Sequence, residues 1–274
     1  MLTTESFSNY THLEIKSTLE LLKIINKEDQ SVPSVIQKSI GTISLLIDKV
    51  FLKMRDGGRL FYIGSGTAGR LGIVDASECP PTFGVNNNVI IGIIAGGDIA
   101  IRNSIEGAED DTSQAWEDLK NHKITKKDSV VGVTASGKTP YVVGGLRQCK
   151  EEGIFTGLLT CNKDSEASEY ADQVIETIVG PEVVTGSTRM KSGTAQKLIL
   201  NMISTSLMIK LGKVKGNKMV DMKLSNSKLI DRGVRFVADE LKIEYNKAKK
   251  LLKESSSVRE VIEKYKKKSL KKDS

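Results

Sequence analysis

The chain has 274 residues, of which 39% are hydrophobic and 27% are charged, so it fits one globular domain with room for a small appendage and is not a disordered chain. Its longest apolar stretch, residues 89–95, is too short to span a bilayer. The first residues, Met-Leu-Thr-Thr-Glu, lack the basic and apolar regions of a secretion signal. We therefore expect a soluble protein that is not exported and has no membrane partner.

The net charge of +7 is unevenly distributed along the chain. Residues 213–274 carry 19 basic and 9 acidic side chains, whereas residues 1–212 carry 22 basic and 25 acidic ones. The positive excess therefore lies near the carboxyl terminus, in a stretch with helical periodicity and no known nucleic-acid-binding signature. This pattern favours a solvated helical surface, and we expect no nucleic acid partner.

Cysteine and histidine are too few and too scattered for a metal centre. The three cysteines, Cys79, Cys149 and Cys161, are odd in number and have no metal-ligand spacing. His12 and His122 are the only imidazoles. We predict reduced thiols and no metal site.

The hydrophobic pattern changes twice along the chain. Residues 13–54 have the spacing of two helices, and the last residues, from about 218, have that of short helices without strands. Between them, short β-branched or apolar runs alternate with helical stretches, the last of which is a long helix over about 193–211. The runs expected to form strands are residues 60–63, 89–95, 130–135, 154–160 and 173–179.

This alternation predicts an α/β fold, a three-layer sandwich with a mostly parallel five-stranded sheet. We divide the chain into an α/β domain with amino-terminal helices, residues 1–212, and a small all-helical unit, residues 213–274. In an open parallel sheet ligands bind at the carboxyl ends of the strands. Three loops at such positions are rich in Gly, Ser and Thr, which suit close approach of an anion: GSGTAGR (64–70), ASGKTP (135–140) and TGSTR (185–189).

The first loop contains the dinucleotide-binding spacing of Gly64, Gly66 and Gly69 directly after a predicted strand. Such a site also needs an acidic residue about twenty positions later to bind the ribose. Residues 86–88 are all asparagine, and the second predicted strand runs into Gly96-Gly97. The pattern is therefore a weak indication of nicotinamide binding.

Residues 132–139, GVTASGKT, match the Walker A motif letter by letter. A P-loop needs a complete strand before its first glycine, but the apolar run here passes through Gly132. The sequence also lacks an apolar run that ends in a Walker B aspartate. We interpret residues 136–139 as a shorter phosphate-binding loop at a helix start, with Pro140 near the first helical position.

Two acidic clusters adjoin these loops. Asp110 and Asp111 are expected to cap a helix. Glu78 precedes Pro80-Pro81, which we expect to end the helix and hold this carboxyl group in a proline-locked, uncharged loop, where a general acid is useful.

At this point the sequence resembles the N-acetylmuramic acid 6-phosphate etherases, which have the sugar isomerase fold. The resemblance covers most of the chain, and its most specific segment, residues 180–194, matches a signature that these etherases share with the related glucokinase regulatory protein. The segments that carry it are LTTE (2–5), residues 64–69, DASECPPTFG (75–84), EGAED (106–110), ASGKTPYV (135–142) and GPEVVTGSTRMKSGT (180–194). Lys138 departs from the arginine of many relatives.

The resemblance implies cleavage of the lactyl ether of a muramic acid phosphate in cell-wall sugar recycling, by a cytoplasmic homodimer without metal or organic cofactor. It also implies that Glu78 and Glu109 are catalytic, the first as proton donor. We expect Glu109, at a predicted helix start, to remove the C2 proton. The residues expected to bind the sugar phosphate are Ser65, Gly66, Thr67, Ser136, Gly137, Lys138, Thr139, Ser187, Thr188, Arg189 and Lys191.

Two alternatives share the expected fold. A sugar-phosphate isomerase needs a carboxylate near C2 as well, but the two glutamates together with residues 187–191 favour the etherase. A non-catalytic sugar-phosphate sensor is also open, although both glutamates are present and the chain is too short for two sugar isomerase domains.

Overall fold

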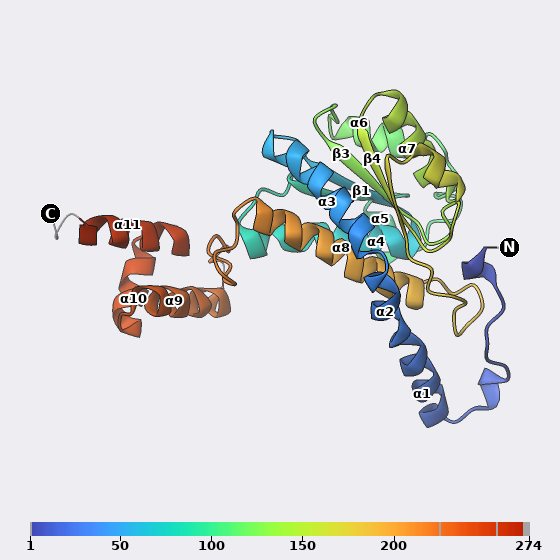
Figure 1. Ribbon diagram of the computed structural model, residues 1–274, viewed down its shortest axis with the longest axis horizontal. Helices are drawn as coiled ribbons and strands as arrows, with labels where there is room; N and C mark the ends of the chain where they lie inside the picture. Colours follow the sequence, from blue (N-terminus) through green and yellow to red (C-terminus); the bar gives the residue numbers. More distant parts are fainter. Residues whose placement is uncertain (1, 225, 256, 271–274) are drawn as a thin grey trace. The chain divides into compact units, whose positions relative to one another are not determined.

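The computed structural model describes residues 2–224, 226–255 and 257–270, with only the backbone of residues 268–270 (Figure 1). The chain forms two compact units. The first contains the chain up to Ser77 and Asn88–Thr205, and the second contains Glu78–Asn87 and the chain from Ser206. The division of the chain at residue 213 stays a prediction.

The first unit is built on a five-stranded sheet in the order β2-β1-β3-β4-β5. Every neighbouring pair is parallel, with Tyr62 opposite Val131 in β1 and β3. This confirms the predicted strands, with small changes at their ends. Their bounds are β1 Leu60–Gly64, β2 Ile90–Ile94, β3 Ser129–Val133, β4 Phe155–Thr160 and β5 Gln173–Glu176.

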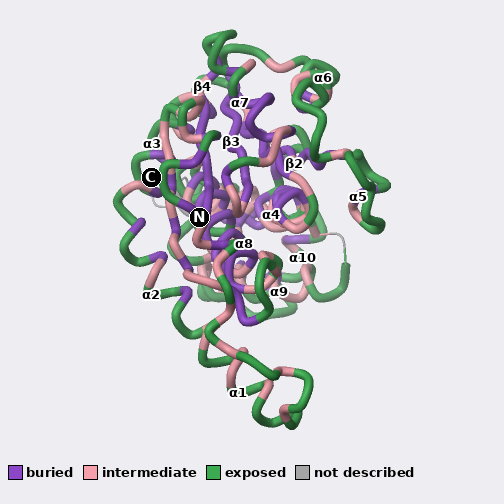
Figure 2. The backbone as a smooth tube through the Cα atoms, turned by 90° about the vertical axis from the view of Figure 1, so that its right-hand side faces the viewer, coloured by how far each residue is buried: buried purple, intermediate pink, exposed green. Residues whose placement is uncertain are grey.

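Helices cover both faces of the sheet, as a three-layer sandwich requires (Figure 1). Phe61, Ile63 and Leu158 face α6 and α7 and belong to a buried cluster with Tyr141 and Leu146 of α7. On the opposite face, a Cβ at Gly157 would lie 2.4 Å from Leu46 of α3, and one at Gly72 of α4 would lie 3.1 Å from Tyr62. The strands and the inner sides of these helices form the buried centre of the unit (Figure 2).

The helices of the first unit have the following bounds: α1 Thr18–Asp29, α2 Ser31–Gln37, α3 Ile40–Arg55, α4 Gly66–Phe83, α5 Ile99–Arg102, α6 Gln114–Asn121, α7 Pro140–Glu151 and α8 Lys191–Lys210, of which α4 and α8 continue into the second unit. Short 3-10 helices lie at η1 Thr3–Glu5, η2 Leu13–Ile15 and η3 Glu166–Tyr170.

The prediction of two helices over residues 13–54 is wrong, because the structure has three there, preceded by η2. Pro33 lies in the first turn of α2 and has no N–H to donate to the carbonyl of Asp29, so α1 cannot run on unbroken into α2. A second break follows at Ser39, between α2 and α3.

The expectation that Pro80-Pro81 end the helix after Glu78 is also wrong, since α4 continues through both prolines to Phe83. The prolines lie in the last turns, and the carbonyl of Pro80 still accepts a hydrogen bond from Gly84, whose φ of +65° ends the helix. The last turns of α4 therefore remain helical although Pro80 and Pro81 have no N–H groups to donate.

The second unit is helical, as predicted, and contains α9 Ser227–Leu241, α10 Tyr245–Lys253 and α11 Val258–Leu270. Its own buried cluster joins these helices through Val234, Leu252 and Val261. The basic residues lie largely at the surface, and several form ion pairs with acidic neighbours, such as Lys266 with Glu240. Residues 271–274 lie outside the described residues.

Along the described part of the chain, no helix is both long and apolar enough to span a bilayer. The three cysteines are buried and none of them forms a disulfide, in agreement with the prediction of reduced thiols. Burial raises the pKa of the Cys149 and Cys161 thiols to about 12, so neither is a reactive thiolate at neutral pH.

Candidate functional site

A cavity of about 260 Å³ lies in the first unit where the loops after β1 and β3 meet. It is lined mostly by small and hydroxyl-bearing residues, and the first turn of α4 contributes three of them. Such a surface offers many hydrogen-bond donors in little space and suits an anion. The lining residues are Glu5, Ser65, Gly66, Thr67, Ala68, Glu109, Thr134, Ala135, Ser136, Thr139, Thr188 and Gln196.

The loop after β3 is held in shape by its own hydroxyl groups. The Oγ1 atoms of Thr134 and Thr139 lie 2.8 Å apart, and Thr134 Oγ1 also accepts from the N–H of Gly137 at 3.2 Å. The Oγ of Ser136 accepts from the N–H of Lys138 at 3.1 Å. The backbone donors of Gly137 and Lys138 are thus used inside the loop, so this loop presents hydroxyl groups to the cavity. Pro140 begins α7, as predicted.

Gly137 is required by this loop for two reasons. Its φ is +70°, a conformation that favours glycine. A Cβ at this position would also lie 2.2 Å from Ser165 Oγ. Gly137 therefore shapes the loop from behind and is not among the residues that line the cavity.

Glu109 is fixed at two points. Its Oε2 accepts a hydrogen bond of 2.9 Å from the hydroxyl of Ser65, and its carbonyl accepts one of 2.9 Å from the N–H of Tyr141. Tyr141 is fully buried, and its hydroxyl donates to Asp118 Oδ2 at 2.6 Å. The first turn of α7 thus anchors the backbone of Glu109, while the loop after β1 orients its carboxylate.

The expectation that Glu109 lies at a helix start is wrong. It lies in a turn, and α6 begins five residues later, at Gln114. Asp111 precedes the N-cap residue Ser113, and its Oδ1 accepts from the N–H groups of Ser113 and Gln114 at the start of this helix. The chain reaches the sheet edge as a loop here, so an argument from the helix dipole does not apply to Glu109.

Glu5 is a cavity residue that we did not predict as part of the site. The amino-terminal segment runs across the loops that bound the cavity: Thr4 exchanges two hydrogen bonds with Asn162, and Ser8 donates to Thr185 Oγ1 and to the carbonyl of Val183. The sequence did contain an indication that Glu5 is functionally important, because residues 2–5 belong to the segments that carry the family resemblance. Periodicity and loop chemistry gave no reason to bring residue 5 to this cavity.

Four other predicted binding residues do not line the cavity: Lys138, Ser187, Arg189 and Lys191. Lys138 and Arg189 are exposed. Lys191 is 2% exposed, and its Nζ pairs with Glu28 Oε2 at 2.5 Å. The start of α8 is further fixed by the buried Glu182, which accepts hydrogen bonds from the N–H groups of Lys191 and Ser192.

Glu78 lies on α4 and belongs to the second compact unit. Its side chain is exposed. The helical conformation described above replaces the proline-locked loop that we expected around it.

Both nucleotide-binding patterns have structural explanations. A Cβ at Gly64 would lie 2.8 Å from the nitrogen of Gly69, so these two glycines allow the end of β1 to pack against the first turn of α4. Gly132 lies inside β3, as expected, where a Cβ would lie 2.6 Å from Val142. The strand therefore continues past the first glycine of the Walker A pattern, as a P-loop does not allow.

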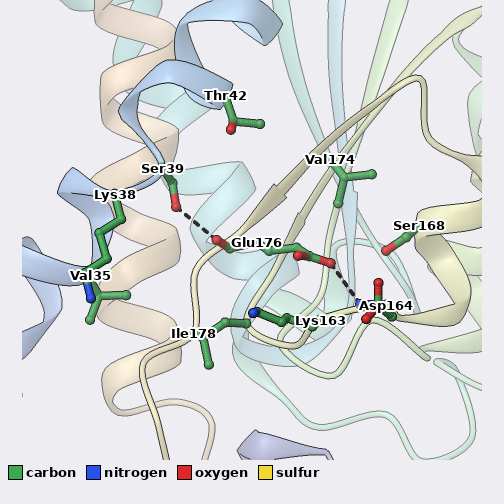
Figure 3. A pocket seen from close by; sticks show the side chains of 10 residues that line it. All are labelled: Val35, Lys38, Ser39, Thr42, Lys163, Asp164, Ser168, Val174, Glu176 and Ile178. Carbon is green, nitrogen blue, oxygen red and sulfur yellow. Dashed lines mark hydrogen bonds between the residues drawn. The ribbon is translucent and has the colours of Figure 1, made fainter.

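A larger cavity of about 710 Å³ lies at the β5 edge of the sheet and contains none of the predicted site residues (Figure 3). Its polar groups hold the fold together: Ser39 donates to the carbonyl of Glu176, and the N–H of Asp164 donates to Glu176 Oε1. Lys38 and Lys163 line it but are exposed. This cavity offers no arrangement of reactive groups.

Among the described residues, no group of three or more His, Cys, Asp or Glu side chains is arranged to hold a metal ion. The side chains that meet in the smaller cavity are instead suited to hydrogen bonding and to proton transfer by a carboxylate.

Comparison with known proteins agrees with this geometry. Residues 42–150 match the family described as Glucokinase regulatory protein N-terminal SIS domain, and residues 110–206 match the SIS domain. In fold, the chain is similar to a solved protein of E. coli CFT073, with a TM-score of 0.55 and 18% identity over 76% of this chain and 96% of that one. It is also similar to a phosphoheptose isomerase from Francisella tularensis, with a TM-score of 0.51 and 12% identity over 73% of this chain and 100% of that one.

Sequence similarity to curated relatives is much higher. The chain is 57% identical to the N-acetylmuramic acid 6-phosphate etherase of Christiangramia forsetii, over 96% of each chain. It is 54% identical to the etherase of the same name from Porphyromonas gingivalis, over 98% of each chain. Because this similarity extends over nearly the whole length of both sequences in each comparison, the chain belongs to the N-acetylmuramic acid 6-phosphate etherase family.

Proposed function

We propose that this protein is a lyase that cleaves the D-lactyl ether of N-acetylmuramic acid 6-phosphate, giving N-acetylglucosamine 6-phosphate and D-lactate in cell-wall sugar recycling. The observation that carries the proposal is the carboxylate of Glu109, held by Ser65 at the rim of a cavity lined by hydroxyl groups. One side of this arrangement suits a phosphate, and the other suits removal of a proton.

The proposed reaction is an elimination followed by addition of water, and it needs one base and one acid. An ether at C3 resists direct hydrolysis at neutral pH, but opening of the sugar ring gives an aldehyde at C1, which makes the C2 proton acidic. A carboxylate then removes that proton, and the C3–O bond breaks as an acid protonates the departing lactate oxygen. Water adds to the unsaturated aldehyde by the reverse steps, and the product has a hydroxyl at C3.

Glu109 is the base in this proposal. Its carboxylate accepts the hydroxyl hydrogen of Ser65, which leaves Oε1 to receive the C2 proton. Glu78 is the acid, an assignment that rests on the family resemblance alone. The ring-opening step is not assigned to a residue.

The phosphate of the substrate lies in the cavity against the hydroxyls of Ser136 and Thr139 and the start of α4, at Gly66 and Thr67. Ser136 Oγ accepts from the N–H of Lys138 and lies 3.3 Å from Thr134 Oγ1, so a bound phosphate would compete with Thr134 for its hydrogen. The first N–H groups of a helix have no partner within the helix and favour an anion. Lys138, Ser187 and Arg189 remain predicted contributors, and so does Lys191, the first residue of α8.

We also propose that the protein is a homodimer that acts in the cytoplasm. Helix α1 has no buried residue (Figure 2). It nevertheless carries apolar side chains, of which Leu19 and Leu22 are 61% and 59% exposed. A two-fold symmetric partner would cover such a surface. Sedimentation should give twice the mass of the 29.9 kDa chain at micromolar concentration, and a mass of one chain would contradict the dimer.

The activity is tested by incubating the purified chain with N-acetylmuramic acid 6-phosphate and measuring released D-lactate. Stoichiometric lactate and N-acetylglucosamine 6-phosphate are expected. A chain that interconverts aldose and ketose phosphates without lactate release would be an isomerase, and one that binds the sugar phosphate without turnover would be a sensor.

A further inference from the structure

The carboxylate of Glu109 borders two cavities of the first unit. Beside the hydroxyl-lined cavity lies a second one of about 410 Å³, and the two share Ser65, Gly66 and Glu109. The second cavity is lined on its far side by Arg70, from α4, and by residues 103–108, from the segment that leads to Glu109. A ligand whose reacting carbon lies at Glu109 therefore has space on both sides of this residue.

The two cavities differ in charge. The residues that line the first include two carboxylates, Glu5 and Glu109, and no Lys or Arg. The second is also lined by two carboxylates, Glu106 and Glu109, but it adds one cation, Arg70, beside the polar side chains of Asn103 and Ser104. A carboxylate, which a guanidinium can bind through two parallel hydrogen bonds, is therefore better accommodated on the Arg70 side.

The guanidinium of Arg70 is held in place but not neutralised. Its Nε donates to the carbonyl of Ile101 at 2.9 Å, and its Nη2 donates to that of Asn103 at 3.2 Å. These two bonds fix the plane of the group and leave its other N–H donors for a ligand. No ion pair links Arg70 to a carboxylate in the part of the chain that the structure describes.

We propose that the Arg70 cavity binds the lactyl carboxylate of the substrate, so that Arg70 determines specificity for the 3-O-lactyl ether. This inference rests on the proposed etherase function. The base acts at C2. The lactyl group is bound through its ether oxygen to the neighbouring C3, and its carboxylate carbon lies three bonds beyond C3. With the phosphate in the first cavity and C2 at Glu109, the lactyl group extends into the second cavity, where Asn103 and Ser104 add hydrogen-bonding groups.

This arrangement also assists the reaction. The substrate carries a carboxylate close to the base, and two such negative charges repel each other. A cation beside the lactyl group offsets this repulsion and holds the leaving group in a fixed orientation to the C2 proton.

The test is a comparison of two ligands that differ in the lactyl group. In a Glu109→Gln background, which slows turnover, calorimetry gives the Kd of N-acetylmuramic acid 6-phosphate and of N-acetylglucosamine 6-phosphate. We expect Arg70→Gln to weaken binding of the first by roughly ten- to hundred-fold, since hydrogen bonds to charged groups are lost, and to leave binding of the second unchanged. Ser104→Ala, which leaves the bonds of Arg70 to the backbone intact, should weaken only the first ligand, by a smaller factor.

Arg102→Gln is the matched control, because it removes a neighbouring exposed cation that does not line the cavity. It should change neither Kd. If Arg70→Gln weakens both ligands equally, Arg70 supports the phosphate or the fold and the inference is overturned; if it weakens neither, the lactyl group binds elsewhere. Failure of the proposed function is a different result, in which neither sugar phosphate binds to any of these proteins.

Discussion

The hydroxyl of Ser65 and the carboxylate of Glu109 lie 2.9 Å apart, although 44 residues separate them in the sequence. The first follows β1, and the second lies between α5 and α6, on the connection that follows β2. Strand order explains the meeting, because β1 and β2 are neighbours in the sheet and their carboxyl ends open onto the same edge.

Ser65→Ala should therefore impair catalysis by freeing the carboxylate of Glu109 to rotate. A hydrogen bond to a charged group contributes about 1.5–3 kcal/mol, so we expect kcat/KM to fall roughly ten- to hundred-fold. Ser65→Thr keeps a hydroxyl group and should recover part of the loss. Equal activity of the alanine variant and the parent would mean that the hydrogen bond does not orient the base.

Ser136→Ala should mainly raise KM. The hydroxyl of Ser136 is oriented by the N–H of Lys138, and we assign it to the substrate phosphate. Its loss should weaken binding by roughly ten- to hundred-fold, with a smaller effect on kcat. Ser39→Ala is the control, because that hydroxyl lies in the other cavity, at the β5 edge (Figure 3). A KM that does not respond to Ser136→Ala would place the phosphate elsewhere.

The amino-terminal segment should be needed for substrate binding. Thr4→Val breaks the hydrogen bond of 2.8 Å from Asn162 and loosens the segment that brings Glu5 to the cavity. A hydrogen bond contributes about 1 kcal/mol, so KM should rise about five-fold. Phe7→Ala changes an 81% exposed side chain of the same segment and should have no effect. If Thr4→Val and Phe7→Ala behave alike in steady-state kinetics, the segment does not shape the site.

A buried carboxyl group on α4 makes stability depend on pH. Burial raises the pKa of Asp75 from 3.8 to about 6, although hydrogen bonds from Ser204, Tyr62 and Asn201 partly oppose the shift. In this pH range the native state holds a proton that the unfolded chain has released. The contribution of Asp75 to the free energy of unfolding is therefore full below pH 3.8 and falls as pH rises to about 6, by at most about 3 kcal/mol.

Asp75→Asn should remove this dependence. Denaturant titrations at several pH values between 4 and 7 measure it as the difference in free energy of unfolding between parent and variant. The free energy of unfolding of the parent should fall relative to that of the Asp75→Asn variant as pH rises. A difference that stays flat over this pH range would show that this carboxyl group does not titrate abnormally.

Much of the fold follows from the sequence because its signals are local. The five apolar runs are short, separated by helices and ended by small residues, so the parallel sheet and its ligand-binding edge are predictable. The hydroxyl loops after β1 and β3 were located in the same way. Asp111, which we expected together with Asp110 to cap a helix, accepts hydrogen bonds from two N–H groups at the start of α6.

The errors concern features that depend on distant contacts. The pair Pro80-Pro81 normally ends a helix, but α4 is held by buried side chains such as Ala76, Cys79 and Phe83. Glu109 looked like a helix start because acidic residues follow it, whereas its position is fixed by Ser65 and Tyr141. Glu5 reaches the cavity through hydrogen bonds to residues more than 150 positions away, which no local pattern contains.

The most direct test of the account follows hydrogen exchange at C2 together with lactate release in deuterated water. The parent should release D-lactate and give N-acetylglucosamine 6-phosphate with deuterium at C2. Glu109→Gln should do neither, whereas Glu78→Gln should still exchange the C2 proton but release little lactate. Free exchange by Glu109→Gln combined with none by Glu78→Gln would reverse the two roles, and lactate release by the parent without any deuterium at C2 would contradict the elimination mechanism itself.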